Sequence, residues 1–148
     1  MKILVLNYEF PPIGGGASPL SYDISKQLAS MGHQVDVVTM GFKGLPSFEH
    51  KDALNIYRVK SIRKKKEVCH FSEMLFFLAP AFFKSLQLQR KNNYDMCHCN
   101  FIIPTGVIAL ALKVFTRIPY IVSIHGTDMP DHNTDRFTFT SVSIEIPK

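Results

Sequence analysis

The sequence predicts an α/β fold built on a doubly wound, Rossmann-like parallel sheet. Apolar runs and helical patterns alternate along the chain, and a glycine-rich loop separates the first run from the first helix. Polar residues follow the ends of several of the runs. Alternation of this kind gives a sheet with helices on both faces. At 148 residues the chain is long enough for one domain with a core and too short for two ordinary domains.

The first strand is expected at Lys2–Asn7, where apolar residues follow one another without alternation. Such a run is typical of a strand that is buried on both faces. Prolines and glycines exclude regular structure just after it. The first helix is expected to open at Ser18, whose hydroxyl suits the N-cap, with Pro19 as its first helical residue. It runs to about Met31, because Gly32 suits a left-handed C-cap.

The other elements follow from the same patterns of spacing. Further strands are expected at Val35–Thr39, Leu54–Lys60, Tyr94–Phe101 and Tyr120–Ile124. Further helices are expected at Phe71–Asn92, interrupted or kinked near Pro80, and at Pro104–Arg117. The composition of Gly41–Lys51 predicts a loop. Apolar residues recur on one side of the first and last helices at Leu20, Ile24, Leu28, Met31 and at Val107, Leu110, Ala111, Val114.

Composition argues against a secreted or membrane-spanning chain. Cys69, Cys97 and Cys99 are an odd number and do not resemble a disulfide framework, so a cytoplasmic location is expected. The first apolar run is too short for the core of a signal peptide. No stretch approaches the ~20 apolar residues that cross a bilayer.

The net charge of +5 is unevenly distributed, because Arg58–Lys66 is strongly basic. Such a run favours acidic partners, whether phosphate, nucleic acid or anionic lipid, and it is equally typical of a solvated loop. No nucleic-acid partner is expected, since few aromatic residues interleave with the charges.

A ligand site is expected where the parallel strands end. The glycine loop lacks Cβ atoms, so a ligand can approach its main chain, and it leads into the positive end of a helix. Asn100 follows another predicted strand, and His125 and Asp128 follow the last one. The glycines also suit a simple turn, and His125 also suits a turn cap.

Two nucleotide motifs can be set aside. The dinucleotide fingerprint has its first glycine directly after the strand, whereas here Asn7–Ile13 lies before Gly14. The acidic residue expected at the end of the second strand is also missing, since Asp36 lies near its start. A P-loop is excluded because no Gly-Lys-Ser/Thr follows the glycines.

The segment Cys97-His98-Cys99 suggests a zinc site at first sight. Alternation on a strand puts His98 on the opposite face from both cysteines, and no second cysteine pair completes four ligands. Core packing is therefore the favoured interpretation.

Four segments together resemble a known enzyme family. Lys2–Asn7 with Pro11–Ala17 looks like the opening of the retaining glycosyltransferases of the GT-B fold, family four. Gly32–Thr39 resembles the family's GHxVxVxT strand, Tyr94–Gly106 its DxxHxH…PxG segment, and Pro119–Asp128 its HGxD turn. The four segments occur in the family's order and cover nearly the whole chain.

The resemblance implies the N-terminal half of a two-domain hexosyltransferase that moves a sugar from a nucleotide-sugar donor to a glycan or lipid-linked acceptor, with retention. This half chiefly binds the acceptor. The family's glycine loop, matched by Gly14, Gly15 and Gly16, lies against the donor diphosphate and sugar. The family's catalytic histidine, matched by His125, lies near the transferred sugar. No metal or other cofactor is expected.

The sequence also departs from the family pattern. Asn100 replaces the usual second histidine and is, with Asp128, assigned to acceptor binding. The glycosyltransferase domain is expected over residues 1–137, and residues 138–148 depart from the pattern, which predicts a truncated chain without its C-terminal donor domain. The isolated chain is then expected to have little or no activity.

Two expectations concern partners. The resemblance implies a peripheral contact with the inner face of the membrane through Arg58–Lys66 and Met74–Phe83, as a surface contact and not a span. The alternative to an enzyme is a non-catalytic Rossmann-like module that uses the same cleft for a phosphorylated or sugar ligand.

Overall fold

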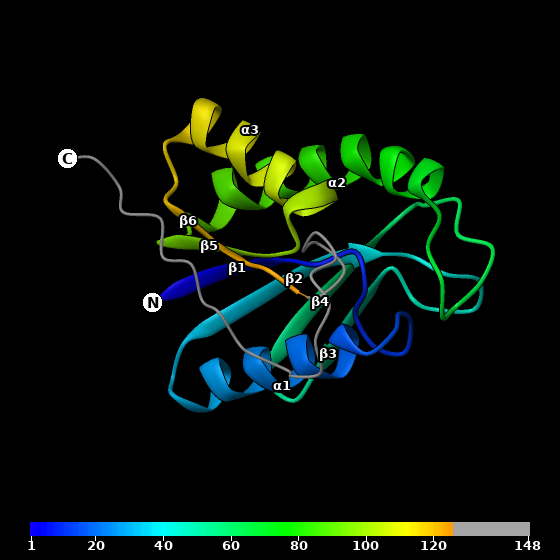
Figure 1. Ribbon diagram of the computed structural model, residues 1–148. Coiled ribbons are helices and arrows are strands. Elements are labelled where there is room, and N and C mark those ends of the chain that lie inside the picture. The colour runs from blue at the N-terminus through cyan, green and yellow to red at the C-terminus, as the bar shows by residue number, and fades with distance from the viewer. Residues whose placement is uncertain (126–148) are drawn as a thin grey trace, which may run out of the picture.

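The computed structural model describes residues 1–125, which form a six-stranded sheet with helices on both faces (Figure 1). The strand order is β3-β4-β2-β1-β5-β6, and every neighbouring pair is parallel except β3 with β4. The strands are β1 (Lys2–Leu6), β2 (Gln34–Met40), β3 (Phe48–Lys51), β4 (Leu54–Val59), β5 (Met96–Asn100) and β6 (Tyr120–Ser123). The helices are α1 (Ala17–Ser30), α2 (Phe71–Asn92) and α3 (Val107–Thr116), with a short kinked turn, η1 (Ile102–Gly106), before α3. The predicted fold class is confirmed.

The predicted elements are present in the predicted order, with boundaries that shift by a few residues. The long helix has the predicted bounds and continues through Pro80. Gly32 has the left-handed backbone expected just after α1, with φ +87°.

One prediction failed in the segment expected to be a loop. Residues 48–51 form β3, which pairs antiparallel with β4 at the edge of the sheet. Its four residues alternate too little and are too exposed to show an apolar pattern. The charged and polar side chains at Glu49, His50 and Lys51 are typical of an edge strand, where they discourage pairing with another chain.

The faces that the outer helices turn to the sheet also differ from expectation. In α1 the fully buried residues are Ser18, Ser21 and Ser25, while Met31 is exposed. In α3 the buried residues are Ile108, Ala109 and Leu112, so the predicted apolar side is the exposed one. Small side chains let a helix approach a sheet closely, which explains why serines occupy the inner face of α1.

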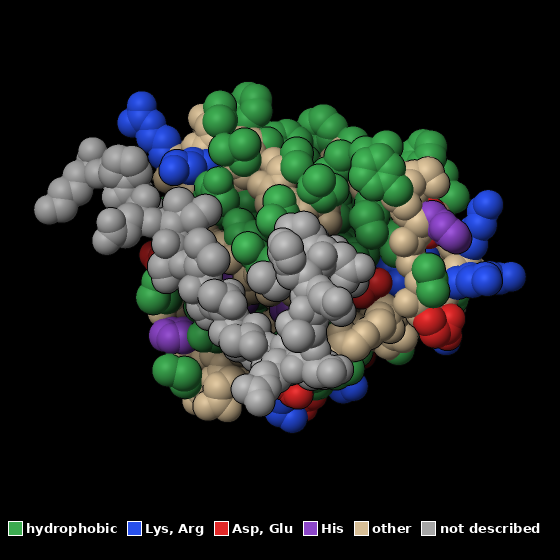
Figure 2. All heavy atoms as spheres, in the orientation of Figure 1, with side chains coloured by type: hydrophobic (Ala, Val, Ile, Leu, Met, Phe, Trp, Pro, Cys, Tyr) green, Lys and Arg blue, Asp and Glu red, His purple; other side chains and the backbone are tan. Residues whose placement is uncertain are grey.

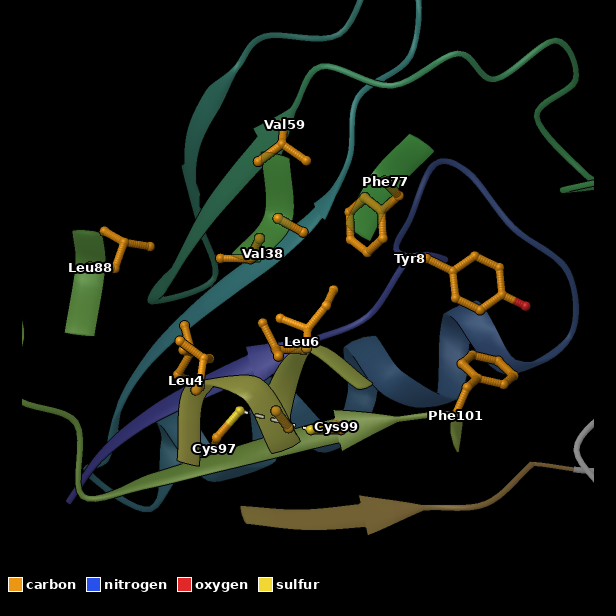
Figure 3. Packing of buried hydrophobic residues seen from close by; sticks show 14 of the residues in the cluster. Leu4, Leu6, Tyr8, Val38, Val59, Phe77, Leu88, Cys97, Cys99 and Phe101 are labelled. Carbon is orange, nitrogen blue, oxygen red and sulfur yellow. Dashed lines mark hydrogen bonds between the residues drawn. The ribbon is translucent and has the colours of Figure 1, made fainter. Parts of the chain in front are cut away.

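Two hydrophobic clusters lie on the two faces of the sheet. The larger joins alternate residues of β1 and β5 to α2 and α3, and Figure 3 shows Leu4, Leu6, Cys97 and Cys99 within it. The two sulfur atoms lie 3.8 Å apart. Burial raises the pKa of the Cys99 thiol well above its ordinary value, and the neighbouring Cys97 adds to the effect. The smaller cluster lies between the sheet and α1.

A buried carboxylate joins three elements near the amino end of β2. Asp36 accepts hydrogen bonds from Asn55 (2.7 Å), from Asn92 (3.1 Å) and from the hydroxyl of Tyr94. These partners come from β4, the end of α2 and the start of the segment leading to β5. Both oxygens of a charge that is 1% exposed are thereby bonded.

Apolar side chains remain exposed over α2 and α3, where Figure 2 shows hydrophobic atoms across the surface. They include Phe76 and Phe83 on α2 and Val114 and Phe115 on α3. Among residues 1–125, no helix combines the length and apolar character that crossing a membrane requires.

Candidate functional site

The strand order reverses between β1 and β5. From β1 the chain proceeds outward to β2 on one side, and it later returns to place β5 on the other side. In open α/β sheets, ligands bind at such a switch point, beyond the carboxyl ends of the strands. The glycine loop follows β1, Asn100 is the last residue of β5, and His125 follows β6, all at this edge. Asp128, the other predicted site residue, lies outside the described residues.

Gly14 is held firmly within the glycine loop. Its N–H donates to the Lys66 carbonyl oxygen at 2.7 Å, and its φ is +106°. A Cβ atom there would lie 2.6 Å from Cβ of Glu9 and 2.9 Å from Cβ of Ser18. Only glycine fits this backbone and this space, so Gly14 shapes the loop and its amide is already paired.

Gly15 and Gly16 are exposed and differ in their contacts. The Gly15 N–H donates to a Glu9 carboxylate oxygen at 3.3 Å, so this amide is already paired with a side chain of the protein. A Cβ on Gly16 would meet no atom within 4 Å. Open space beside Gly16 is what the approach of a ligand to the main chain requires.

The amino end of α1 has no side-chain cap. Gly16 is the N-cap, and no acidic residue lies in the first turn. The prediction that Ser18 caps this helix is wrong, because Ser18 lies inside α1 and donates to the Ile13 carbonyl oxygen at 2.7 Å. An uncapped helix start leaves the positive end of the helix dipole available to an anion, although the Ser18 N–H already donates to the Gly15 carbonyl oxygen at 3.1 Å and Pro19 has no N–H.

The basic segment contributes to this edge in an unexpected way. Arg63 is buried and donates to the carbonyl oxygens of Lys66 (3.0 Å) and Tyr8 (3.4 Å). It also pairs with Glu9 at 3.5 Å. Since Lys66 accepts the bond from Gly14, Arg63 joins the 60–70 segment to the glycine loop. Of the basic run, Arg58 and Arg63 are therefore interior residues, and only the lysines are solvated.

Two buried asparagines end β1 and β5 side by side. Leu6 pairs with Cys99, so Asn7 and Asn100 occupy the next position of the register. Both are almost fully buried, and neither side-chain NH₂ group has a hydrogen-bond partner among residues 1–125. Buried donors without partners are uncommon in native proteins, and a bound ligand or water is a usual explanation. The sequence reasoning missed Asn7 because it counted that residue as the end of a strand.

His125 and Asn100 are brought together. The imidazole Nε2 of His125 lies 3.1 Å from Oδ1 of Asn100. The Phe101 ring lies 4.7 Å from that of His125 and 4.9 Å from that of Tyr8, measured between centroids. Figure 3 shows Tyr8 and Phe101 facing one another. A row of rings therefore connects the ends of β1, β5 and β6 at the predicted edge.

A second histidine lies on the same side of β5 as Asn100. His98 Nε2 lies 2.8 Å from the Ser123 hydroxyl oxygen of β6. Burial, together with the neighbouring His125, lowers the pKa of His98. The His98 side chain therefore lies on the opposite face of β5 from the two cysteines, as the alternation of side chains along a strand predicts. Residues 1–125 contain no cluster of three or more His, Cys, Asp or Glu side chains arranged to hold a metal ion.

The family is decided by comparison of the sequence with family models. The model for Glycosyltransferase Family 4 matches residues 14–143, which is most of the chain. The chain belongs to glycosyltransferase family 4. The resemblance identified from the glycine loop and the HGxD turn is thereby confirmed.

Two curated relatives agree with the glycosyltransferase family assignment. An uncharacterized glycosyltransferase of Methanocaldococcus jannaschii is 35% identical over 130 residues, which is 87% of this chain and 32% of that protein. N-acetyl-alpha-D-glucosaminyl L-malate synthase of Bacillus anthracis is 28% identical over 120 residues, which is 80% of this chain and 30% of that protein. The chain thus spans about a third of the length of these relatives.

Among solved structures, sucrose-phosphate synthase from Thermosynechococcus elongatus matches with a TM-score of 0.70. The identity is 17%, and the match covers 85% of this chain and 33% of that one. At this identity the likeness concerns the fold alone, which is that of a GT-B Rossmann-like domain.

Proposed function

We propose that this glycosyltransferase family 4 chain is the acceptor-side domain of a retaining enzyme that transfers a hexose from a nucleotide-sugar donor to a glycan or lipid-linked acceptor. The observation that supports it best is the edge at the strand switch point. There an uncapped helix start, two unpartnered buried amides and His125 follow adjacent strands.

In this proposal the main chain at Gly15 and Gly16 and the start of α1 bind the donor diphosphate. Amide donors that face a departing diphosphate stabilise the negative charge that grows during transfer. The Glu9 carboxylate, which now accepts from Gly15, has to leave before a phosphate takes its place. Gly14 keeps the loop in shape and does not itself meet the donor.

His125 is assigned to the reacting sugar, and Asn100 and Asp128 to acceptor hydroxyl groups. The buried, unpartnered NH₂ groups of Asn100 and Asn7 are suited in their chemistry to hydroxyl or phosphate oxygens. The Oδ1 atom of Asn100 faces Nε2 of His125. This contact does not use the amide hydrogens of Asn100, which the proposal assigns to the ligand. No metal is assigned a role.

The donor is proposed to bind mainly to a second, C-terminal domain, which the length of the relatives supports. Without that domain half of the donor site is missing, and positioning supplies much of catalysis. We therefore expect the isolated chain to transfer little or no sugar.

The test compares the isolated chain with a chimera. Residues 1–137 replace the matching segment of the Methanocaldococcus jannaschii relative, and both proteins are assayed with a panel of nucleotide sugars and acceptors. The chimera is expected to release nucleoside diphosphate and to glycosylate an acceptor, while the isolated chain does neither. A folded chimera without transfer, or robust turnover by the isolated chain, would contradict the proposal.

Variants of the chimera then test the assigned residues. His125→Ala is expected to lower kcat by about 10²-fold, the effect of losing one well-placed polar group. Gly16→Ala is expected to fold normally, since its added methyl group enters only open space. It is expected to weaken donor use, because that methyl group occupies space that the proposal gives to the donor. His33→Ala, at the opposite edge of the sheet, serves as the control and should leave kcat unchanged.

The alternative is a non-catalytic module that binds a phosphorylated or sugar ligand at the same edge. It predicts a different result from the same proteins, namely saturable ligand binding without transfer by any chimera. The unpartnered amides of Asn7 and Asn100 favour a ligand in either case.

The proposal extends to contact with a membrane surface that carries a lipid-linked acceptor. Exposed side chains on α2, such as Leu75, Phe76 and Phe83, and the solvated Lys64–Lys66 support it. Sedimentation with anionic lipid vesicles is the measurement, and Phe76→Ser combined with Lys65→Glu is expected to abolish binding. Equal binding by that variant would contradict the membrane contact.

A further inference from the structure

A hollow lies away from the candidate site, between α2 and the strand pair β3–β4. Its volume is about 610 Å³, within the range of small-ligand pockets. Side chains from the end of β4, the start of β3 and the middle of α2 line it. Four strand spacings of ~4.8 Å separate β4 from β6, so the hollow lies roughly 19 Å across the sheet from the strand that leads to His125.

The lining combines cations with aromatic rings. Lys60 and Lys84 supply positive charge, Arg58 lines the hollow with its own charge paired to Glu49, and none of the described lining residues is acidic. Phe48 and Phe83 also line it and are exposed by 50% and 66%. The Lys84 ammonium group lies 4.9 Å from the Tyr57 ring centroid.

Arg58 shows that this cationic lining is built into the fold. Its side chain is only 2% exposed and pairs with Glu49 at 2.8 Å. Weaker bonds at 3.5 Å and 3.4 Å join it to the Pro46 and Pro11 carbonyl oxygens. Its Nε–H has no hydrogen-bond partner in the part of the chain that the structure describes. A buried arginine with an unused donor beside a hollow is a feature that bound anions or waters commonly explain.

The lysines and the exposed aromatic rings of the hollow favour different parts of one ligand. The cations favour a carboxylate or a phosphate. Exposed aromatic faces favour a partner with an apolar surface of its own, which a bare inorganic anion lacks. A sugar ring supplies C–H groups for the aromatic faces and can carry the anionic group for the lysines.

We propose that the hollow lined by Arg58, Lys84 and Phe83 binds an acidic sugar, that is, a sugar bearing a carboxylate or a phosphate. This binding is separate from the reaction proposed above and does not require transfer. An acidic glycan bound there lies across the sheet from the strand that leads to His125, at a distance that a single sugar does not span.

The test is an NMR titration of the ¹⁵N-labelled 148-residue chain with four probes. These are glucuronate, glucose 6-phosphate, glucose and inorganic phosphate. Saturable shifts of the Lys60, Lys84 and Phe48 amides are expected for the two acidic sugars, with Kd of about 1 mM. Glucose and inorganic phosphate are each expected to bind about tenfold more weakly.

Matched variants identify the contacts. Lys84→Glu should raise the Kd of both acidic sugars about tenfold, which is the expected effect of losing one hydrogen bond to a charged group. Lys91→Glu makes the same charge change farther along α2, outside the hollow, and should leave Kd unchanged. Phe83→Ala should weaken the sugars but not inorganic phosphate, and Phe76→Ala, an exposed ring outside the hollow, should weaken neither.

Three results would overturn the proposal. The first is that neither acidic sugar gives saturable shifts at the hollow. The second is that inorganic phosphate binds as tightly as glucose 6-phosphate, which would mean a general anion site. The third is that Lys91→Glu weakens binding as much as Lys84→Glu. If Lys84→Glu does not fold, as judged by circular dichroism, Lys60→Glu replaces it at an exposed position.

Discussion

Two buried polar clusters lie at opposite ends of the same sheet. Near the amino end, Asp36 has hydrogen bonds to both carboxylate oxygens from Asn55, Asn92 and Tyr94. At the carboxyl end, Asn7 and Asn100 are equally buried, yet their NH₂ groups have no partner within the described residues. Burial alone therefore does not distinguish the clusters, whereas the pairing of their donors and acceptors does.

The difference shows which cluster the fold needs for itself. A buried carboxylate that lacked its donors would cost several kcal/mol, so the Asp36 cluster is fully paired. Unused donors at the carboxyl end cost stability as well, and proteins tolerate such costs mainly at functional sites. We expect changes at the amino end to affect folding and changes at the carboxyl end to affect ligand binding.

The largest effect is expected for Asp36→Ala. The substitution removes the acceptor of the buried Tyr94 hydroxyl and of the half-buried Asn55 and Asn92 amides, so the free energy of unfolding should fall by about 3–5 kcal/mol. Urea unfolding followed by circular dichroism measures it. Asp23→Ala, an exposed carboxylate on α1, is the control and should change stability by less than about 0.5 kcal/mol. A loss below about 1 kcal/mol for Asp36→Ala would refute the structural role of this cluster.

Arg63→Ala should have the next largest effect. It removes the bonds that join Glu9, Tyr8 and Lys66 and leaves a mostly buried carboxylate without its partner. The expected loss is about 2–3 kcal/mol. Hydrogen exchange at the Gly14 amide should also become faster, because its acceptor, the Lys66 carbonyl, loses its support. Lys65→Ala, an exposed neighbour, is the control, and unchanged exchange at Gly14 in Arg63→Ala would contradict the link.

The sequence allows the fold to be predicted because the apolar runs and their spacing are local signals. It does not reveal β3, because Phe48–Lys51 is a short exposed edge with no such signal. The inner face of α1 was predicted only in part, since Leu28 packs against the smaller cluster but the fully buried residues are Ser18, Ser21 and Ser25. Close approach of helix and sheet determines that choice, and it depends on residues far away in the chain.

The same distinction applies to the candidate site. Asn100 and His125 could be identified because each follows a predicted strand, and parallel strands end at one edge. The burial of Arg63 could not be predicted, because it depends on pairing with Glu9, which lies 54 positions away in the sequence. Nor could the unpaired amide of Asn7, since only the packed structure shows which donors lack partners.

A smaller, pH-dependent effect is expected for Tyr94→Phe. Burial, reinforced by the Asp36 carboxylate, raises the pKa of the Tyr94 phenol well above its ordinary value of 10.0. The native state therefore keeps this proton after the unfolded state has lost it, so stability is complete below pH 10 and falls as the pH rises further. Tyr94→Phe should cost about 1–2 kcal/mol at pH 7 and reduce the slope above pH 10 by about 1.4 kcal/mol per pH unit.

Urea unfolding at pH 7, 9, 10 and 11 measures this slope. Some slope remains in the variant, because the Asp52 hydrogen bond raises the pKa of Tyr22 to about 12. An unchanged slope in Tyr94→Phe would mean that the Tyr94 phenol is not held neutral by the cluster.

The smallest change in stability is expected at the carboxyl end, for Asn7→Ala and Asn100→Ala. Each substitution loses one hydrogen bond through Oδ1, to Glu9 N–H or to His125, and also removes a buried donor that had no partner. The two effects oppose one another, so the free energy of unfolding should change by less than about 1 kcal/mol. In the chimera, the same variants should weaken ligand use by about tenfold, since a ligand oxygen loses its donor. A loss of stability as large as that of Asp36→Ala, with unchanged ligand use, would show that both ends of the sheet serve the fold alone.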